Sequence, residues 1–277
     1  MVPAAVYPVP EATESALALL LLLVAVVLPI YLLVFRPVVR RDTWGIAEMV
    51  GIAMLFILAL PLLAIMAGLA EPITLVGLSV ITIVQNALFV GLPAYVVTVR
   101  YGLTPARLGA RFDGWPRLAA IGAVIALLTL PLSIGSENLA VFLLGLIEGP
   151  TQAAARAAAE HLSDPLQPIL TTLAGVAPVG WVLFLLTVVV PIGEETFFRG
   201  FVYGGLRTRW GAVAGTLVSA AFFSAVHAQV VHGLPIFLLG VVLALLYERT
   251  GSLLPPMIAH AVNNVIAVLS VWRDWGF

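Results

Sequence analysis

Two adjacent carboxylates and an arginine interrupt an apolar stretch in the second half of the chain: Glu194, Glu195 and Arg199. Residues 181–190, directly before them, carry no charge. Ionisable groups at membrane depth are costly, so such groups indicate a functional site by default. Glu195 and Arg199 are four residues apart and are predicted to pair on one helical face. Glu194 lies roughly 100° further round the helix and stays available for another partner. The alternative is an ion pair that only fixes helix packing.

Three further polar residues, His227, His260 and Asn264, lie in other apolar stretches. Glu194 and His227 are sixteen and seventeen residues from Trp210, where we expect a turn between two helices. Both should therefore lie at similar depth, roughly 24–26 Å from that turn. His260 and Asn264 share a helical face but lie only roughly 14 Å from their own turn at Gly251. The depths agree if the helix ends near Trp210 project into water.

These residue types support hydrolysis of an amide bond. A carboxylate and an imidazole around one water can act as general base and orienting group. A second imidazole and an amide N–H can donate to a developing oxyanion. A zinc site with Glu194, His227 and His260 as three ligands is the competing interpretation. Their spacing does not decide between the two, and the sequence has no H-E-x-x-H run. Few carboxylates lie near the histidines in sequence to orient them as zinc ligands require.

The composition predicts a membrane protein. The chain has 277 residues, of which 62% are hydrophobic and 10% charged, with a mean hydropathy of +1.12. A soluble domain is closer to half apolar and a quarter charged. No barrel-like alternation appears, so the spans should be helical. A net charge of -1 gives no indication of nucleic-acid binding, and the absence of cysteine excludes disulfides, thiolate zinc sites and a cysteine nucleophile.

The fold class expected is all-α: a polytopic helical bundle of about eight transmembrane helices around an intramembrane polar cavity. Residues 139–147 are apolar but too short to cross, and 151–162 form an Ala-rich helix capped at Thr151, so both are assigned to an outer connection. We expect residues 1–165 to hold the N-terminal helices and this connection, and 166–277 to hold the catalytic core, in one integrated membrane domain. The predicted spans are 15–35, 46–67, 73–99, 118–134, a fifth from about 169 that carries Glu194, 212–228, 234–248 and 253–271.

The arginines predict the orientation in the cell membrane. They gather in the loops 36–41, 100–117 and 207–209 and at Arg249. Arginine-rich short loops stay in the cytoplasm. Both termini and the acidic connection at 137–164 are then non-cytoplasmic.

Three motifs occur in order: E-E-x-x-F-R-G at 194–200, F-x-x-x-H at 223–227 and H-x-x-x-N at 260–264. Together they resemble the CAAX protease and bacteriocin-processing family (CPBP or Abi), which includes the type II CAAX prenyl endopeptidases. Residues 1–165 carry no motif of this kind.

The resemblance implies an intramembrane endopeptidase. By it, Glu194 activates water with His227, and His260 with Asn264 forms the oxyanion site. The resemblance also assigns a site-shaping role to three residues: Glu195, Arg199 and Phe223.

We favour a metal-free glutamate peptidase without a cofactor, with zinc as the alternative. The partners implied are the lipid bilayer and a peptide or protein substrate, including membrane-anchored ones. Two non-peptidase functions stay open. One is an ion-relaying transporter, although no inverted repeat is detectable. The other is a non-catalytic binding protein, such as a bacteriocin-immunity protein.

Overall fold

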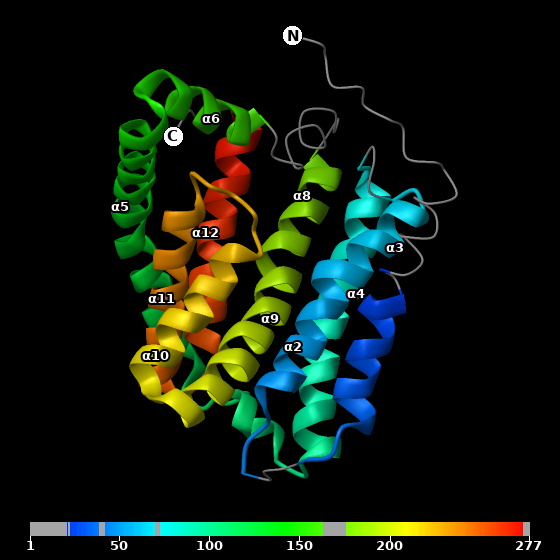
Figure 1. The fold of residues 1–277 in the computed structure, drawn as a ribbon. Coiled ribbons are helices and arrows are strands. Elements are labelled where there is room, and N and C mark those ends of the chain that lie inside the picture. The colour runs from blue at the N-terminus through cyan, green and yellow to red at the C-terminus, as the bar shows by residue number, and fades with distance from the viewer. Residues whose placement is uncertain (1–20, 22, 39–41, 70–72, 163–175, 274–277) are drawn as a thin grey trace, which may run out of the picture.

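The computed structural model describes residues 21, 23–38, 42–69, 73–162 and 176–273 (Figure 1). Every regular element in these ranges is a helix, which confirms the all-α bundle. The elements are η1 (Tyr31–Phe35), α2 (Ile46–Met54), η2 (Leu55–Ala59), α3 (Leu60–Met66), α4 (Leu75–Tyr95), η3 (Val96–Arg100), η4 (Pro105–Leu108), α5 (Trp115–Glu148), α6 (Pro150–Leu162), α8 (Val176–Phe184), η5 (Leu185–Val189), α9 (Val190–Glu195), η6 (Thr196–Tyr203), α10 (Gly204–Ala225), α11 (Gly233–Thr250) and α12 (Leu254–Arg273).

Five helices are long and apolar enough to cross a membrane, judged by length and composition: Ile46–Met66, Leu75–Arg100, Trp115–Glu148, Pro178–Ala225 and Gly233–Thr250. Two shorter apolar helices, Leu23–Phe35 and Leu254–Leu269, accompany them. The 48-residue span Pro178–Ala225 reverses at Gly211, whose φ of 80° and ψ of 172° are not helical. Counted as two arms, it brings the described segments to the eight that were predicted. The start of the first span and residues 163–175 lie outside the described residues.

The turn at Gly211 lies one residue after the expected position at Trp210. Glycine adopts a positive φ at little steric cost, which suits it to this reversal. The two arms then approach closely, because a Cβ on Gly215 would lie 3.0 Å from the backbone N of Arg207.

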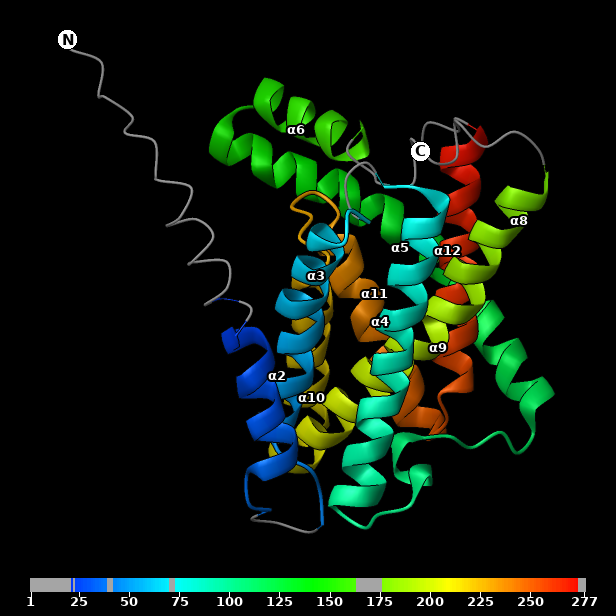
Figure 2. The same ribbon diagram turned by 90° about the vertical axis from the view of Figure 1, so that its right-hand side faces the viewer.

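The prediction for residues 118–147 was wrong. Instead of a span ending near 134 and a separate interfacial segment at 139–147, α5 runs without a break from Trp115 to Glu148. The Oγ atoms of Ser133 and Ser136 donate to the carbonyls of Thr129 and Ser133 at 3.2 and 2.9 Å, so the helix itself satisfies these polar groups. At 34 residues the helix is roughly 51 Å long, against roughly 30 Å for the hydrocarbon core of a bilayer. Its second half therefore has room to project from the membrane, and α6, which begins at Pro150 rather than after a cap at Thr151, folds back across the end of the bundle (Figure 2).

One aromatic core joins the first and second halves of the chain. Phe197 stacks on Phe89 of α4 with ring centroids 5.0 Å apart and meets Phe56 edge-on at 5.1 Å. Phe201 stacks on Trp44 at 5.1 Å with an interplanar angle of 4°. Such pairs contribute roughly 0.5–1.5 kcal/mol each beyond their buried area. The segment that carries Glu194 and Glu195 is thus packed against helices from residues 1–165.

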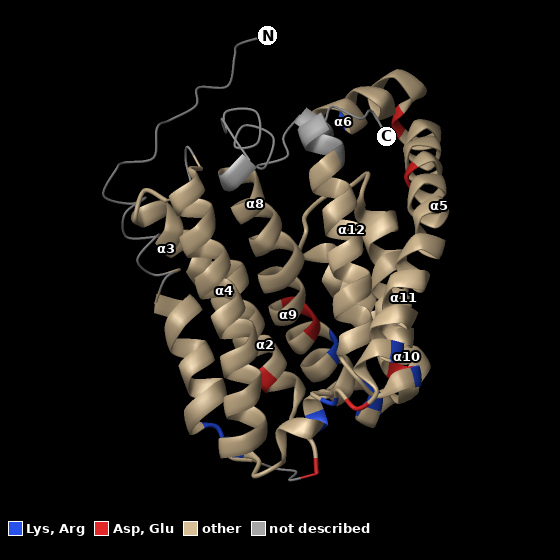
Figure 3. Cartoon of the chain, turned by 180° about the vertical axis from the view of Figure 1, so that it is seen from behind, with Lys and Arg blue, Asp and Glu red and all other residues tan. Residues whose placement is uncertain are grey.

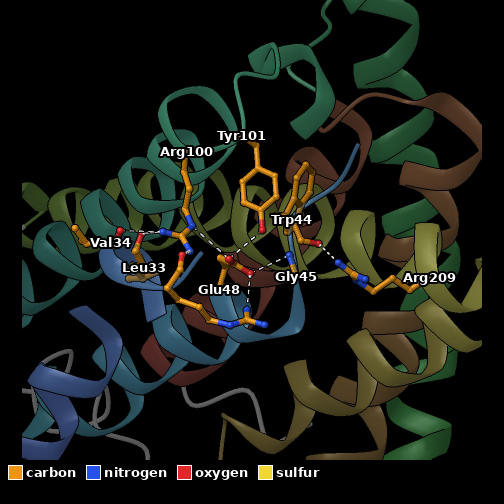
Figure 4. A network of polar contacts seen from close by, with 9 residues as sticks. Leu33, Val34, Trp44, Gly45, Glu48, Arg100, Tyr101 and Arg209 are labelled. Carbon is orange, nitrogen blue, oxygen red and sulfur yellow. Dashed lines mark hydrogen bonds and ion pairs between the residues drawn. The ribbon is translucent and has the colours of Figure 1, made fainter. Parts of the chain in front are cut away.

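A polar network at the arginine-rich end fixes the first helices to each other (Figure 4). The fully buried carboxylate of Glu48 accepts from Nε of Arg100 at 3.3 Å and from the hydroxyl of Tyr101 at 2.9 Å. Burial, together with the hydrogen bond to Glu48, raises the pKa of Tyr101 to about 12. Arg100 also donates to the carbonyls of Leu33, Val34 and Arg36, which ties the end of η1 to η3.

Trp44 extends this network to η6. Its indole Nε1 donates to the carbonyl of Phe201 at 2.8 Å. Its own carbonyl accepts from Nη2 of Arg209 at 2.9 Å (Figure 4).

The charged residues are unevenly distributed along the bundle (Figure 3). Most described arginines lie at the end that holds η4 and the α10 reversal, whereas α6 and the end of α5 lie at the opposite end. The arrangement agrees with the predicted grouping of the arginine loops on one side. Which side is cytoplasmic stays a prediction, as do the domain boundaries.

Candidate active site

The backbone around the two carboxylates is not a regular α-helix. α9 has only six residues and lies between the π-helical segments η5 and η6. π-helical turns are rare and occur frequently at functional sites. The sequence analysis assumed α-helical spacing throughout and did not anticipate them.

Glu195 and Arg199 form the predicted ion pair, with Nη1 of Arg199 3.0 Å from Oε1 of Glu195. Both side chains are buried, at 1% and 0% exposure. The same Oε1 lies 2.8 Å from Nδ1 of His260, reached from α12. One buried carboxylate oxygen therefore serves an arginine and a histidine.

His260 lies between the two carboxylates. Its Nδ1 faces Glu195, and its Nε2 lies 3.9 Å from Oε2 of Glu194, too far for a direct hydrogen bond. A carboxylate accepts, so the contact assigns the proton to Nδ1 and directs Nε2 toward Glu194. Glu194 is 13% exposed, and its buried Oε2 has no hydrogen-bond partner among the described residues.

Phe223 lies between the two histidines. Its ring centroid is 4.8 Å from that of His227 and 5.9 Å from that of His260, both edge-on. The guanidinium carbon of Arg199 lies 4.2 Å from the same ring, in cation–π range. Phe223 thus contacts three of the residues that the motifs singled out.

His227 lies just past the end of α10, in a turn, and its side chain is exposed. Its Nδ1 is 2.7 Å from the carbonyl of Phe223, which requires the proton on Nδ1 and leaves Nε2 as an acceptor in the neutral ring. The structure brings Arg199 and His260 to the same oxygen of Glu195 and places Glu194 3.9 Å from His260, whereas Phe223 mediates the contact with His227.

Asn264 contacts the backbone of η5 rather than one of the other candidate residues in the hydrogen bonds of the described chain. Its Nδ2 donates to the carbonyl of Leu186 at 2.7 Å. A side-chain amide carries two N–H donors, so the second stays available.

The structure shows how the two histidines that could bind zinc are oriented. Both histidines have an Nδ1 acceptor, the carboxylate of Glu195 for His260 and the carbonyl of Phe223 for His227. The sequence predicted few carboxylates to orient the histidines and assigned Glu195 to Arg199, but tertiary packing brings the same carboxylate to His260 as well. Across the described ranges, however, no three His, Cys, Asp or Glu side chains are grouped closely enough to hold a metal ion. The set Glu194, His227 and His260 is not such a group in this arrangement.

A cavity of about 240 Å³ opens at the arginine-rich end, away from these residues. None of the candidate site residues lines it; its walls include Trp44, Arg107, Arg111, Arg207, Tyr247 and Glu248. It is not the polar cavity that the sequence predicted beside Glu194.

Comparison with known proteins shows which family part of the chain resembles. Residues 158–266 match a family model described as Type II CAAX prenyl endopeptidase Rce1-like. This confirms the resemblance based on the three motifs, all of which lie within the Rce1-like segment.

Two curated bacterial proteins are similar to part of the chain. An Escherichia coli protein named "Uncharacterized 24.3 kDa protein" is 32% identical over 116 residues, covering 39% of this chain and 54% of the relative. The Bacillus subtilis (strain 168) protein named "Putative membrane peptidase YdiL" is 32% identical over 107 residues, covering 39% and 43%. The chain thus spans about half the length of the curated relatives it matches. No solved structure matches it.

Sequence reasoning missed two contacts in the Rce1-like segment. It gave Glu195 one partner, Arg199, although a carboxylate has lone pairs for several donors. It also did not predict the hydrogen bond from Asn264 to the carbonyl of Leu186. An i to i+4 argument finds neighbours on one helix, and both missed contacts join different helices.

Proposed function

We propose that the protein is an intramembrane endopeptidase in which Glu194 activates a water molecule. The observation that carries the proposal is His260, held by Glu195 through Nδ1 with its Nε2 3.9 Å from a carboxylate oxygen of Glu194. A water molecule beside these two atoms could hydrogen-bond to both, and Oε2 of Glu194 has no hydrogen-bond partner in the described part of the chain. The match of residues 158–266 to an endopeptidase family supports the same function.

In the proposed reaction, the water oxygen attacks the carbonyl carbon of the scissile peptide bond while Glu194 takes one water proton. The carbonyl electrons move to its oxygen, where the remaining N–H of Asn264 donates to the developing negative charge. The C–N bond then breaks, and the proton on Glu194 moves to the leaving nitrogen. Glu195 acts here as a positioning residue that sets the tautomer of His260, and Arg199 holds the same oxygen of Glu195 in place through its ion pair.

His227 is the second imidazole of the proposed site. Phe223 separates its ring from that of His260, so we assign it to the opposite side of the substrate carbonyl. The substrate is a polypeptide that enters from the bilayer or its surface, in keeping with a site inside apolar helices.

The test compares new protein N-termini in the membrane fraction of cells that carry the wild type, Glu194→Gln or Glu148→Gln. Glu148 is the matched control, because its carboxylate pairs with Arg156 at the far end of α5. We expect new N-termini with the wild type and Glu148→Gln, and none with Glu194→Gln at equal protein abundance. A synthetic peptide spanning one such cleavage site should then be cut by purified wild type about 10²–10⁴ times faster than by Glu194→Gln. Identical N-termini in all three strains, or none in any, would contradict a peptidase that uses Glu194 as its base.

A further inference from the structure

The loop that joins α10 to α11, residues 226–232, contains His227 and is held by a side chain of α6. The carboxylate of Glu160, near the end of α6, accepts from the backbone N–H of Val230 at 2.9 Å and of Val231 at 3.0 Å. Its second oxygen accepts from Val231 at 3.0 Å and His232 at 3.4 Å. Figures 1 and 2 show this loop, in orange, beneath α6. Three consecutive backbone donors thus converge on one side chain about seventy residues away in sequence.

The same loop contains the one non-glycine residue of the described chain with a positive φ, Ala228 at 54°. It immediately follows His227. A residue with a Cβ rarely adopts this conformation, and it persists where surrounding contacts enforce it. The base of the loop is closed by Ser224, whose Oγ donates to the carbonyl of Gly233 at 2.7 Å. The backbone N–H groups at the start of the loop, residues 226–228, donate to carbonyls of α10, and those at its end, residues 230–232, donate to Glu160.

We propose that Glu160 is a positioning residue for His227: by holding the 226–232 loop, α6 fixes where the imidazole of His227 lies relative to Phe223 and His260. The hydrogen bonds to Glu160 do not depend on the proposed peptidase; only the consequence for catalysis does.

Titratable groups of three elements surround this carboxylate. His232 of the loop lies 3.3 Å from Oε2 of Glu160 and 3.8 Å from Glu137 of α5, and Arg156 lies one turn earlier on α6. Burial acts to raise the pKa of Glu160, but the loop N–H groups and His232 together lower it below its ordinary value of 4.5. A lowered pKa means that the contact is complete above pH 4.5 and is lost as the pH falls through the lowered value.

The first measurement is hydrogen exchange of the full-length protein in detergent, read on peptides that cover the 226–232 loop. In Glu160→Gln the neutral amide presents an NH2 group where one acceptor was, so the amides of Val230 and Val231 should exchange about tenfold faster or more. Glu148→Gln is the same substitution on a carboxylate that does not touch the loop, and it should leave their exchange unchanged. Equal exchange in Glu160→Gln and the wild type would overturn the proposal.

The second measurement follows His227 itself without any substrate. The chain has four histidines, so selective ¹⁵N-histidine labelling gives four imidazoles, assigned through single His→Gln variants. In Glu160→Gln the ring signals of His227 should shift, whereas those of His260 should not. If the loop amides exchange faster but the ring signals of His227 do not shift, Glu160 makes a structural contact that does not position His227. That outcome would overturn the proposal. Should Glu160→Gln fail to fold, Glu160→Asp provides the same test, since its shorter carboxylate cannot reach all three donors.

The peptide cleavage assay separates the two proposals. If the peptidase is correct, Glu160→Gln should lower kcat with KM within about twofold and an unchanged thermal midpoint, since substrate binding is kept and transition-state contacts are lost. The alternative outcome is that the protein cleaves no peptide while Glu160→Gln still speeds loop exchange and shifts the His227 signals. That result would support the positioning role of Glu160 and refute the peptidase.

Discussion

Nδ1 of His260 on α12 and Oε1 of Glu195 on α9 lie 2.8 Å apart, with Arg199 3.0 Å from the same oxygen. Glu195 therefore holds two cationic or donor groups from two helices in a fully buried position. Its second oxygen, Oε2, has no hydrogen-bond partner in the described part of the chain. A carboxylate in this position couples the packing of the bundle to the orientation of the imidazole.

We predict that Glu195→Gln destabilises the protein strongly, because it leaves the guanidinium of Arg199 buried without a counter-charge. Breaking a buried pair in this way costs roughly 3–5 kcal/mol. The thermal midpoint in detergent, measured by scanning fluorimetry, should fall accordingly. The double variant Glu195→Gln, Arg199→Met removes both charges and should recover most of that loss. A single variant as stable as the wild type, or a double variant no better than the single one, would show that the pair is not coupled as described.

We predict that Gly193→Ala is destabilising because of a single neighbour. A Cβ at Gly193 would overlap the side-chain oxygen of Asn86, which lies buried on α4 with its Nδ2 donating to Thr82. Overpacking of this kind costs typically about 1–3 kcal/mol. Asn86→Ala in the same chain removes the obstacle, so the pair of substitutions should have a higher thermal midpoint than Gly193→Ala alone. Failure of this rescue would mean that α4 and α9 do not pack through this contact.

We predict that the purified, active protein contains far less than one zinc per chain. Glu194, His227 and His260 are not grouped as three metal ligands, since Phe223 lies between the two imidazoles. Elemental analysis of protein prepared without chelator provides the measurement. Stoichiometric zinc, with cleavage lost to a chelator and restored by zinc alone, would contradict this prediction. It would mean that these three residues are metal ligands and that Glu194 is not the general base of a metal-free site.

We predict that both termini are non-cytoplasmic. The chain has no native cysteine, so single substitutions at Ser15 and Ser270, whose side chains lie outside the described residues, and at Thr104 before η4 can be labelled selectively. A membrane-impermeant maleimide should react with Ser15→Cys and Ser270→Cys from the non-cytoplasmic side and with Thr104→Cys from the cytoplasmic side. Reaction of all three from one side would require a different number of spans.

The length of the apolar stretches and the positions of the arginines were sufficient to predict most of the helices, because a bilayer imposes both. They failed at α5, where serine hydroxyls bonded within the helix allow it to continue through the polar residues around Glu137. They also failed at α9, since no simple periodicity distinguishes a π-turn from an α-turn over five to eight residues. Within the candidate site, the pair of Glu195 with Arg199 follows from spacing on one helix. The contact of Glu195 with His260 depends on how α12 packs against α9, which spacing does not encode.

The Rce1-like segment is incomplete as a folding unit. Phe197 and Phe201 lie within it, yet they pack on Phe89, Phe56 and Trp44, all of which precede residue 158. If residues 158–266 were transplanted alone, these rings would lose their neighbours, and the carbonyl of Phe201 would lose the indole N–H that it accepts from. A segment that carries no recognisable motif is therefore constrained, at these positions, by the volume and shape of its aromatic side chains. A homologue could vary the neighbours of these rings in η2 and α4 and still be held to this architecture, provided that flat, bulky side chains lie at the positions of Phe56 and Phe89 and an indole lies at that of Trp44.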